Sequence, residues 1–223
     1  SPITFTTLTK SHVGNYYYIY DSGSGALEYY DGSDGSSSSP ELANGIIATG
    51  QGFWTYDWGW ITFKETDKTA STATFVKSQT DVDLSLYLTI SENSSTYHST
   101  MCIQEDIATM DGVDSTFDIR HFTTGFEKAP SIAAYSGEDL IRKNYIKDDF
   151  RNKSFDLYTK ILNQGYHTIE AINLENFTNY RKVLLFDNVT GEFIDLKKEL
   201  AYTFYSDVFE GHRFTLVLTN EEL

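Results

Sequence analysis

The sequence predicts an all-β protein, and three observations lead to this prediction. Aromatic residues that favour strands are abundant, with 16 Tyr and 15 Phe among 223 residues. Long stripes of Ala, Leu, Glu and Lys at helical spacing are missing. Short strand-like runs are separated by turn residues along the whole chain. We therefore predict two antiparallel β-sandwich domains, a jelly-roll-like domain over residues 1–148 and an immunoglobulin-like domain over residues 149–223.

The first predicted domain consists of strand-like runs on both sides of a polar loop. The loop, DGSDGSSSSP over residues 31–40, is flexible in composition and cannot pack a core. The most hydrophobic passage, GIIATGQGFWTYDWGWITF, follows it. The remaining predicted strands are ITFTTL, NYYYIYD, ALEYYD, ATFVK, LSLYLTI, YHSTMCIQE, SIAAYS and LIRKNYI.

The second predicted domain begins at about Asp149, with the boundary placed at Lys147–Phe150. About seven short strands follow at regular spacing, which is typical of an immunoglobulin-like sandwich. Alternation along one of them places Phe155, Leu157, Thr159 and Ile161 on one face. The sequence Asn188-Val189-Thr190-Gly191 predicts a hairpin turn whose glycine can adopt positive φ.

Charge and hydropathy exclude several kinds of partner. The formal net charge is −15, so the chain offers no basic face to nucleic acid or to an anionic membrane surface. No apolar run is long enough to insert into a membrane. The single Cys102 excludes an intrachain disulfide, and we expect it to be a buried, inert thiol. The start at Ser1-Pro2, without a signal peptide, suggests a processed product or a segment of a longer chain.

The segment QEDIATMDGVDSTFD, residues 104–118, is crowded with carboxylates and has three interpretations. Ca²⁺ prefers several oxygen ligands in flexible geometry, which such a loop can supply. The segment could instead be a solvated loop in which Asp111 caps a turn and Gly112 adopts positive φ. In another interpretation, Arg120 pairs with Asp118 or Glu105. A catalytic carboxylate pair would need burial and a cleft. The candidate calcium ligands are Glu105, Asp106, Asp111, Asp114 and Asp118.

The stretch FWTYDWGWITF contains a candidate ligand-binding surface. Trp54, Tyr56, Trp58 and Trp60 alternate, so one strand would project them from a single face. Exposed flat rings of this kind stack on the apolar faces of sugars or contact another protein. Alternatively, the rings fill the core between the sheets, and Gly59 marks a bulge. Both interpretations remain open on the sequence.

The chain contains no HExxH, GxSxG or P-loop motif, and we predict that it is not an enzyme.

Several segments, in order, resemble a β-sandwich module of Bacteroidota cell-surface proteins that precedes the type IX secretion system C-terminal sorting domain. The residues that carry the resemblance are GNYYYIYDSGSG, ATGQGFW, EDIATMDGVDSTFDIRHF, KAPSIAAYSGEDLIRKNYI, KVLLFDNVTGEFIDLKKELAYTFYSD and RFTLVL. Two departures from the family pattern concern the ends. The opening strand that family members carry is expected before Ser1, and the sorting domain is expected after Leu223.

The resemblance implies a non-catalytic structural or adhesive module of a secreted, extracellular protein on the cell surface of a Gram-negative bacterium. The expected partners are other domains of the same parent protein and other copies of the chain, joined through the sheet edge that a missing opening strand leaves. The alternative function is a carbohydrate-binding module that holds polysaccharide through the tryptophans. Calcium is the candidate cofactor.

Overall fold

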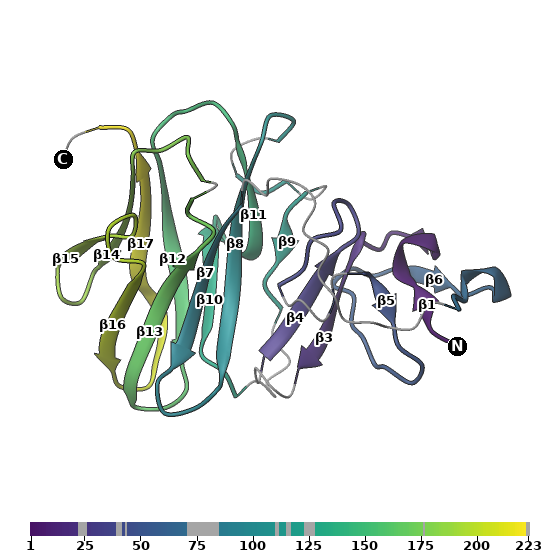
Figure 1. The fold of residues 1–223 in the computed structure, drawn as a ribbon. Coiled ribbons are helices and arrows are strands. Elements are labelled where there is room, and N and C mark those ends of the chain that lie inside the picture. Colours follow the sequence, from purple (N-terminus) through teal and green to yellow (C-terminus); the bar gives the residue numbers. More distant parts are fainter. Residues whose placement is uncertain are drawn as a thin grey trace. The chain divides into compact units, whose positions relative to one another are not determined.

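Strands dominate the structure, a computed structural model that describes residues 1–21, 26–38, 42, 44–70, 85–109, 112–114, 117–122, 128–175 and 177–221 (Figure 1). The prediction of an all-β protein is confirmed, since helix in the described ranges is limited to short 3-10 turns. Contacts divide the chain into two units, Ser1–Asp21 with Leu27–Asp81 and Ser22–Ala26 with Val82–Leu223. Within the described residues, helices long and apolar enough to cross a membrane are absent.

The first unit is built from short strands in pairs. The pairs are β1 with β5, β2 with β6, and β3 with β4. A small aromatic and aliphatic core, which includes Phe5, Tyr17 and Ile47, holds these pairs together. The elements are β1 (Ile3–Thr4), η1 (Phe5–Thr7), β2 (Thr9–Ser11), β3 (Tyr16–Asp21), β4 (Ala26–Asp31), β5 (Ile46–Ile47), β6 (Trp60–Thr62) and η3 (Glu65–Asp67).

The second unit contains one large mixed sheet. Its strands run in the order β15-β14-β17-β12-β10-β11-β8-β7-β13-β16, and β9 pairs with β11. The strands are β7 (Ser85–Glu92), β8 (His98–Asp106), β9 (Ile119–Arg120), β10 (Ser131–Ser136), β11 (Asp139–Lys147), β12 (Lys153–Ile161), β13 (Gly165–Ile172), β14 (Lys182–Asp187), β15 (Glu192–Asp195), β16 (Ala201–Ser206) and β17 (Phe209–Thr219).

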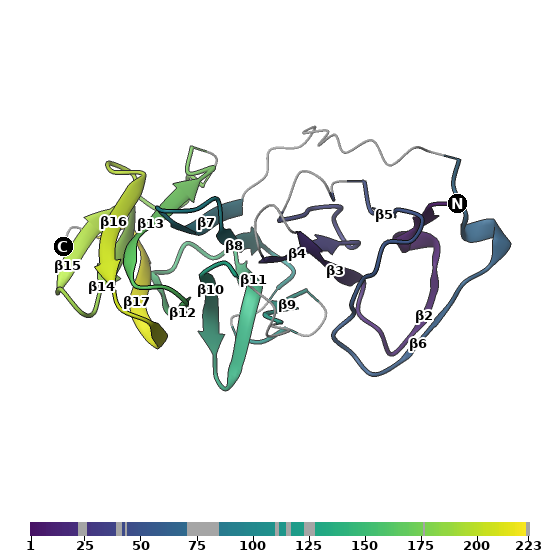
Figure 2. The same ribbon diagram turned by 90° about the horizontal axis from the view of Figure 1, so that it is seen from below.

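The large sheet folds over itself at β11. The first residues of β11 pair with β10, with Ala134 opposite Ile141. Its later residues pair with β8 in parallel, with Asn144 opposite Ile103. A register shift interrupts the ladder between β9 and β11. Figure 2 shows the consequence: β16, β13, β7 and β8 follow one side of this unit, and β14, β17, β12 and β10 follow the other.

The two ends of the sheet approach each other, so the sheet is nearly closed. Tyr202 on β16 donates a hydrogen bond to Asp187 on β14, at 3.2 Å between Oη and Oδ2. The Phe204 ring on β16 packs against Phe214 on β17, with 4.9 Å between ring centroids. The space that the sheet encloses is filled by aliphatic and aromatic side chains such as Leu88, Ile132 and Leu216.

The division into units differs from the predicted domains of 1–148 and 149–223. Strand β10 pairs with β12 across the predicted boundary at Lys147–Phe150, and β7 pairs with β13. Strands from both sides of that boundary therefore share one sheet and one core. In the described residues after Asp149 there are six strands, β12 to β17, where about seven were predicted, and Gly191 adopts positive φ in the predicted hairpin turn.

Candidate functional site

Three indole rings of the first unit are exposed to solvent. Trp58 is 98% exposed, Trp60 is 75% exposed and Trp54 is 37% exposed; we call these three residues the tryptophan surface. Tyr56 is only partly exposed. An indole that is almost completely in water is unusual, because burying its large apolar area is favourable. The sequence left two alternatives for these rings, exposure to a ligand or burial in the core. Their exposure excludes burial in the core.

The backbone that carries these rings is anchored on both sides of Trp58. The Asp57 carboxylate accepts a hydrogen bond from the Gly14 amide, at 2.9 Å. Gly59 lies so close to the backbone of Ser11 and His12 that an added Cβ would collide with the Ser11 carbonyl oxygen. Trp58 is thus an exposed ring on a fixed loop.

The tryptophans do not lie on one continuous strand, as the alternation predicted. Trp54 exchanges two backbone hydrogen bonds with Tyr18, at 2.8 and 2.9 Å. Trp60 begins β6 and pairs with Ser11 on β2. The backbone between them bends at Tyr56–Trp58, because Gly59 is packed against the Ser11–His12 segment. The rings are therefore presented by two anchored segments and the loop that joins them.

The acidic segment is the second candidate site, and Glu105 is its most unusual member. This residue lies near the end of β8 and is only 5% exposed. Its Oε2 accepts a hydrogen bond from Asn179 Nδ2 at 3.0 Å, and the same nitrogen lies 3.2 Å from Asp148 Oδ1. Burial, and next the Asp148 carboxylate, raise the pKa of Glu105 to about 7. Glu105 therefore changes its protonation state near neutral pH.

Asp118 has a structural role in the loop that precedes β9. Its two carboxylate oxygens accept hydrogen bonds from the backbone amides of Tyr145, at 2.8 Å, and Asp114, at 2.7 Å. Burial nevertheless raises the pKa of Asp118 to about 6. Arg120, considered as a partner for Asp118 or Glu105, forms an ion pair with Asp139 at 3.4 Å.

Asp106 ends β8 and lies in a turn of its own, apart from the loop of Asp114 and Asp118. The Asp106 carboxylate accepts a hydrogen bond from the Ala108 amide, at 2.7 Å, in a local turn. Gly112 adopts positive φ, as the loop interpretation expected. Asp111 lies outside the described residues. Within the ranges that the structure describes, no group of three or more His, Cys, Asp or Glu side chains could hold a metal ion.

Sequence reasoning missed the partners of Glu105. Asp148 and Asn179 come from two loops, and Asn179 is 74 residues from Glu105 in the chain. Pairing between β8 and β11 aligns Glu105 with Ile146, close to Asp148. A parallel pair leaves no local turn signal in a sequence, so this juxtaposition had no detectable pattern. Cys102, in contrast, is buried as predicted.

Comparison of the chain with models of protein families found no match. Comparison with curated proteins found none either. Solved structures also gave no match.

Proposed function

We propose that the chain is a non-catalytic adhesive module that contacts neutral polysaccharide through the tryptophan surface. The observation that carries this proposal is the nearly complete exposure of Trp58 on a loop anchored by Asp57 and Gly59. A ring whose backbone is already fixed loses little conformational entropy when a ligand covers it. Indole rings supply a flat apolar area that matches the apolar face of a sugar.

The surroundings of the rings favour polysaccharide over a protein partner. Protein interfaces have a contiguous apolar centre in which charged residues are depleted. Here Thr55 and Asp57, together with Tyr56, lie between Trp54 and Trp58 in the chain. Short polar side chains between rings suit a ligand whose own surface alternates apolar faces with hydroxyl groups.

Charge favours a neutral polysaccharide. The formal net charge of −15 repels polyanions at long range. Neutral sugars are unaffected by this charge, so their binding should persist at high ionic strength.

The wider setting follows from the sequence resemblance and is part of the proposal. The module would belong to a secreted, surface-attached protein of a Gram-negative bacterium, and a sheet edge would permit assembly with other copies. Light scattering at high protein concentration tests the assembly, and a strictly monomeric chain contradicts it.

The polysaccharide proposal is tested by affinity electrophoresis in native gels that contain galactomannan, xylan or β-glucan. We expect at least one gel to retard the wild type, and Trp58→Ala with Trp60→Ala to abolish the retardation without changing thermal stability. Tyr166→Ala is the matched control, because Tyr166 is an exposed aromatic residue of the second unit. Retardation that survives in the double variant would refute the proposal.

A further inference from the structure

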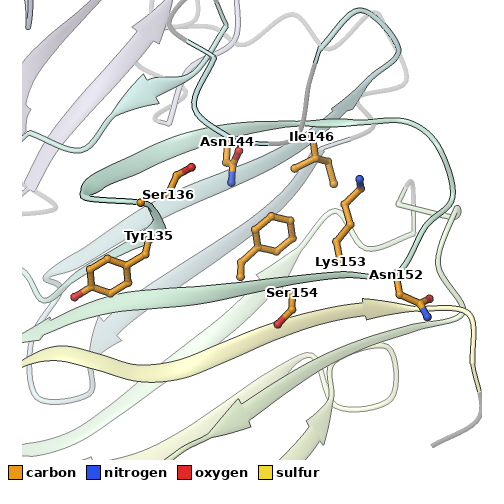
Figure 3. A pocket seen from close by; sticks show the side chains of 10 residues that line it. Tyr135, Ser136, Asn144, Ile146, Asn152, Lys153 and Ser154 are labelled. Atoms are coloured by element: carbon orange, nitrogen blue, oxygen red, sulfur yellow. The ribbon is translucent and has the colours of Figure 1, made fainter.

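A polar pocket in the second unit lies between β11 and the start of β12. Its volume is about 410 Å³, which is within the range of about 300–1,000 Å³ for small-molecule sites. Strand β11 contributes Asn144 and Ile146, and β12 contributes Lys153 and Phe155. Because side chains alternate along a strand, each of these pairs projects from one face of its strand. Figure 3 shows Asn144, Ile146 and Lys153 extending into the same space.

Asn144 is the residue that marks this pocket as a binding site. It is 5% exposed and lines the pocket, and its amide atoms are not among the fully buried polar atoms without a partner. The amide therefore faces the space of the pocket, where water can be its hydrogen-bond partner. A ligand that enters the pocket can replace this water with its own donor and acceptor.

The other lining residues define the chemistry of the ligand. The Ser136 side chain, at the end of β10, adds a hydroxyl group. Ile146 and Phe155 add an apolar wall. Lys153 already forms an ion pair with Asp149, at 3.2 Å between Nζ and Oδ1. Because this cation is compensated and the chain is strongly acidic, a phosphate or carboxylate ligand is disfavoured.

We propose that this pocket binds a neutral polyhydroxylated molecule, such as a single sugar ring, with Asn144 as the residue that hydrogen-bonds its hydroxyl groups. An amide both donates and accepts, so it can engage two neighbouring hydroxyl groups at once. The Phe155 ring and Ile146 suit the apolar face of the same molecule. The pocket belongs to the second unit, so this site is separate from the tryptophan surface and does not depend on it.

Ligand-observed saturation-transfer NMR on the full chain tests the proposal. The probes are glucose, galactose, mannose and N-acetylglucosamine at millimolar concentration, with sorbitol and glycerol as open-chain polyols. We expect at least one probe to receive saturation. Transfer to ring sugars alone identifies a sugar site, whereas transfer to sorbitol as well identifies a general polyol site. Transfer to none of the probes overturns the proposal.

Asn144→Leu is the decisive variant, because leucine has a similar volume but forms no hydrogen bonds. We expect its affinity for the bound probe to fall by at least about ten-fold, which corresponds to about 1.4 kcal/mol. Its thermal midpoint should stay close to that of the wild type, because leucine keeps the packing volume of the replaced side chain. Unchanged affinity in this variant overturns the proposal. If the variant does not fold, Ser136→Leu, which narrows the pocket at a half-buried position, must abolish binding instead.

Two controls separate this site from the tryptophan surface and from general effects of mutation. Asn93→Leu makes the same substitution at an exposed turn of the second unit and should leave probe binding unchanged. Trp58→Ala should also leave probe binding unchanged, while Asn144→Leu should leave retardation by polysaccharide unchanged. Each proposal can thus fail without the other.

Discussion

Replacing Glu105 by glutamine should remove a pH-dependent loss of stability from the second unit. The pKa of Glu105 rises from an ordinary 4.5 to about 7 in the fold, first because of burial and then because of Asp148. The folded protein therefore holds this proton more tightly than the unfolded chain does. The resulting stabilisation is complete below pH 4.5 and is lost as the pH rises through 7.

The size of the effect follows from the pKa difference. About 2.5 pKa units, at about 1.4 kcal/mol each, amount to about 3.5 kcal/mol in the free energy of unfolding. For a domain of this size, about 3.5 kcal/mol corresponds to about 7–14 °C in the midpoint of thermal unfolding. The amide of the Glu105→Gln variant would be neutral at every pH and would keep an oxygen that accepts the Asn179 hydrogen bond.

The assay is thermal unfolding by circular dichroism from pH 4.5 to about pH 8, which spans the two pKa values of Glu105. Glu105→Gln and wild type should have similar midpoints at the acidic end, and the variant should be more stable at the alkaline end. Asp118, whose pKa also rises to about 6, is present in both proteins and cancels from the difference. Glu170→Gln, at an exposed position of β13, serves as the control. Parallel curves for Glu105→Gln and wild type would show that the reasoning about Glu105 is wrong.

Three further outcomes are expected. Gly59→Ala should destabilise the first unit by about 1–3 kcal/mol through overpacking, because the added Cβ would collide with the Ser11 carbonyl oxygen. Gly52→Ala is the control, because nothing lies within 4 Å of its added Cβ. Denaturant titration should show a loss of stability for Gly59→Ala and no change for Gly52→Ala. Asp187→Asn should lower the free energy of unfolding by about 3–5 kcal/mol, because it leaves the buried Arg213 without its counter-charge. In the wild type, Arg213 Nη2 lies 2.9 Å from Asp187 Oδ2. As the control, Glu65→Gln breaks an exposed ion pair with Lys68 and should lower the free energy of unfolding by less than about 1 kcal/mol. If the acidic segment holds calcium, millimolar Ca²⁺ but not Mg²⁺ should raise the midpoint of thermal unfolding above its value in EDTA. Asp111→Asn or Asp114→Asn should remove this rise. Equal midpoints in Ca²⁺ and in EDTA would show that the segment is a solvated loop.

The sequence was most informative where structure is local. Alternation along Phe155–Ile161 and the turn at Asn188–Gly191 correspond to β12 and to the hairpin of β14 and β15. Hydrogen bonds within a hairpin join strands that are adjacent in the chain, so the residues of the connecting turn predict the pairing. The class of fold could therefore be predicted without any long-range information.

Long-range pairing was not accessible in the same way. The parallel alignment of Ile146 with Glu105 joins strands that no turn connects. The predicted domain boundary at Lys147–Phe150 was based on a change in the spacing of strand-like runs. In the structure, β10 and β12 lie on opposite sides of this boundary in the sequence but are neighbours in one sheet. Exposure of Trp58 was equally hidden, because alternation specifies the faces of a strand and not which face meets water.

The position of β17 in the sheet determines when the second unit can fold during synthesis. Phe209–Thr219 lies between β12 and β14 and pairs with both. Until the ribosome has released this segment, β12 and β14 each expose an unpaired edge, which is a risk for aggregation. The layer that contains them therefore closes late, and its many non-local pairings place folding on the slow side, about milliseconds to seconds.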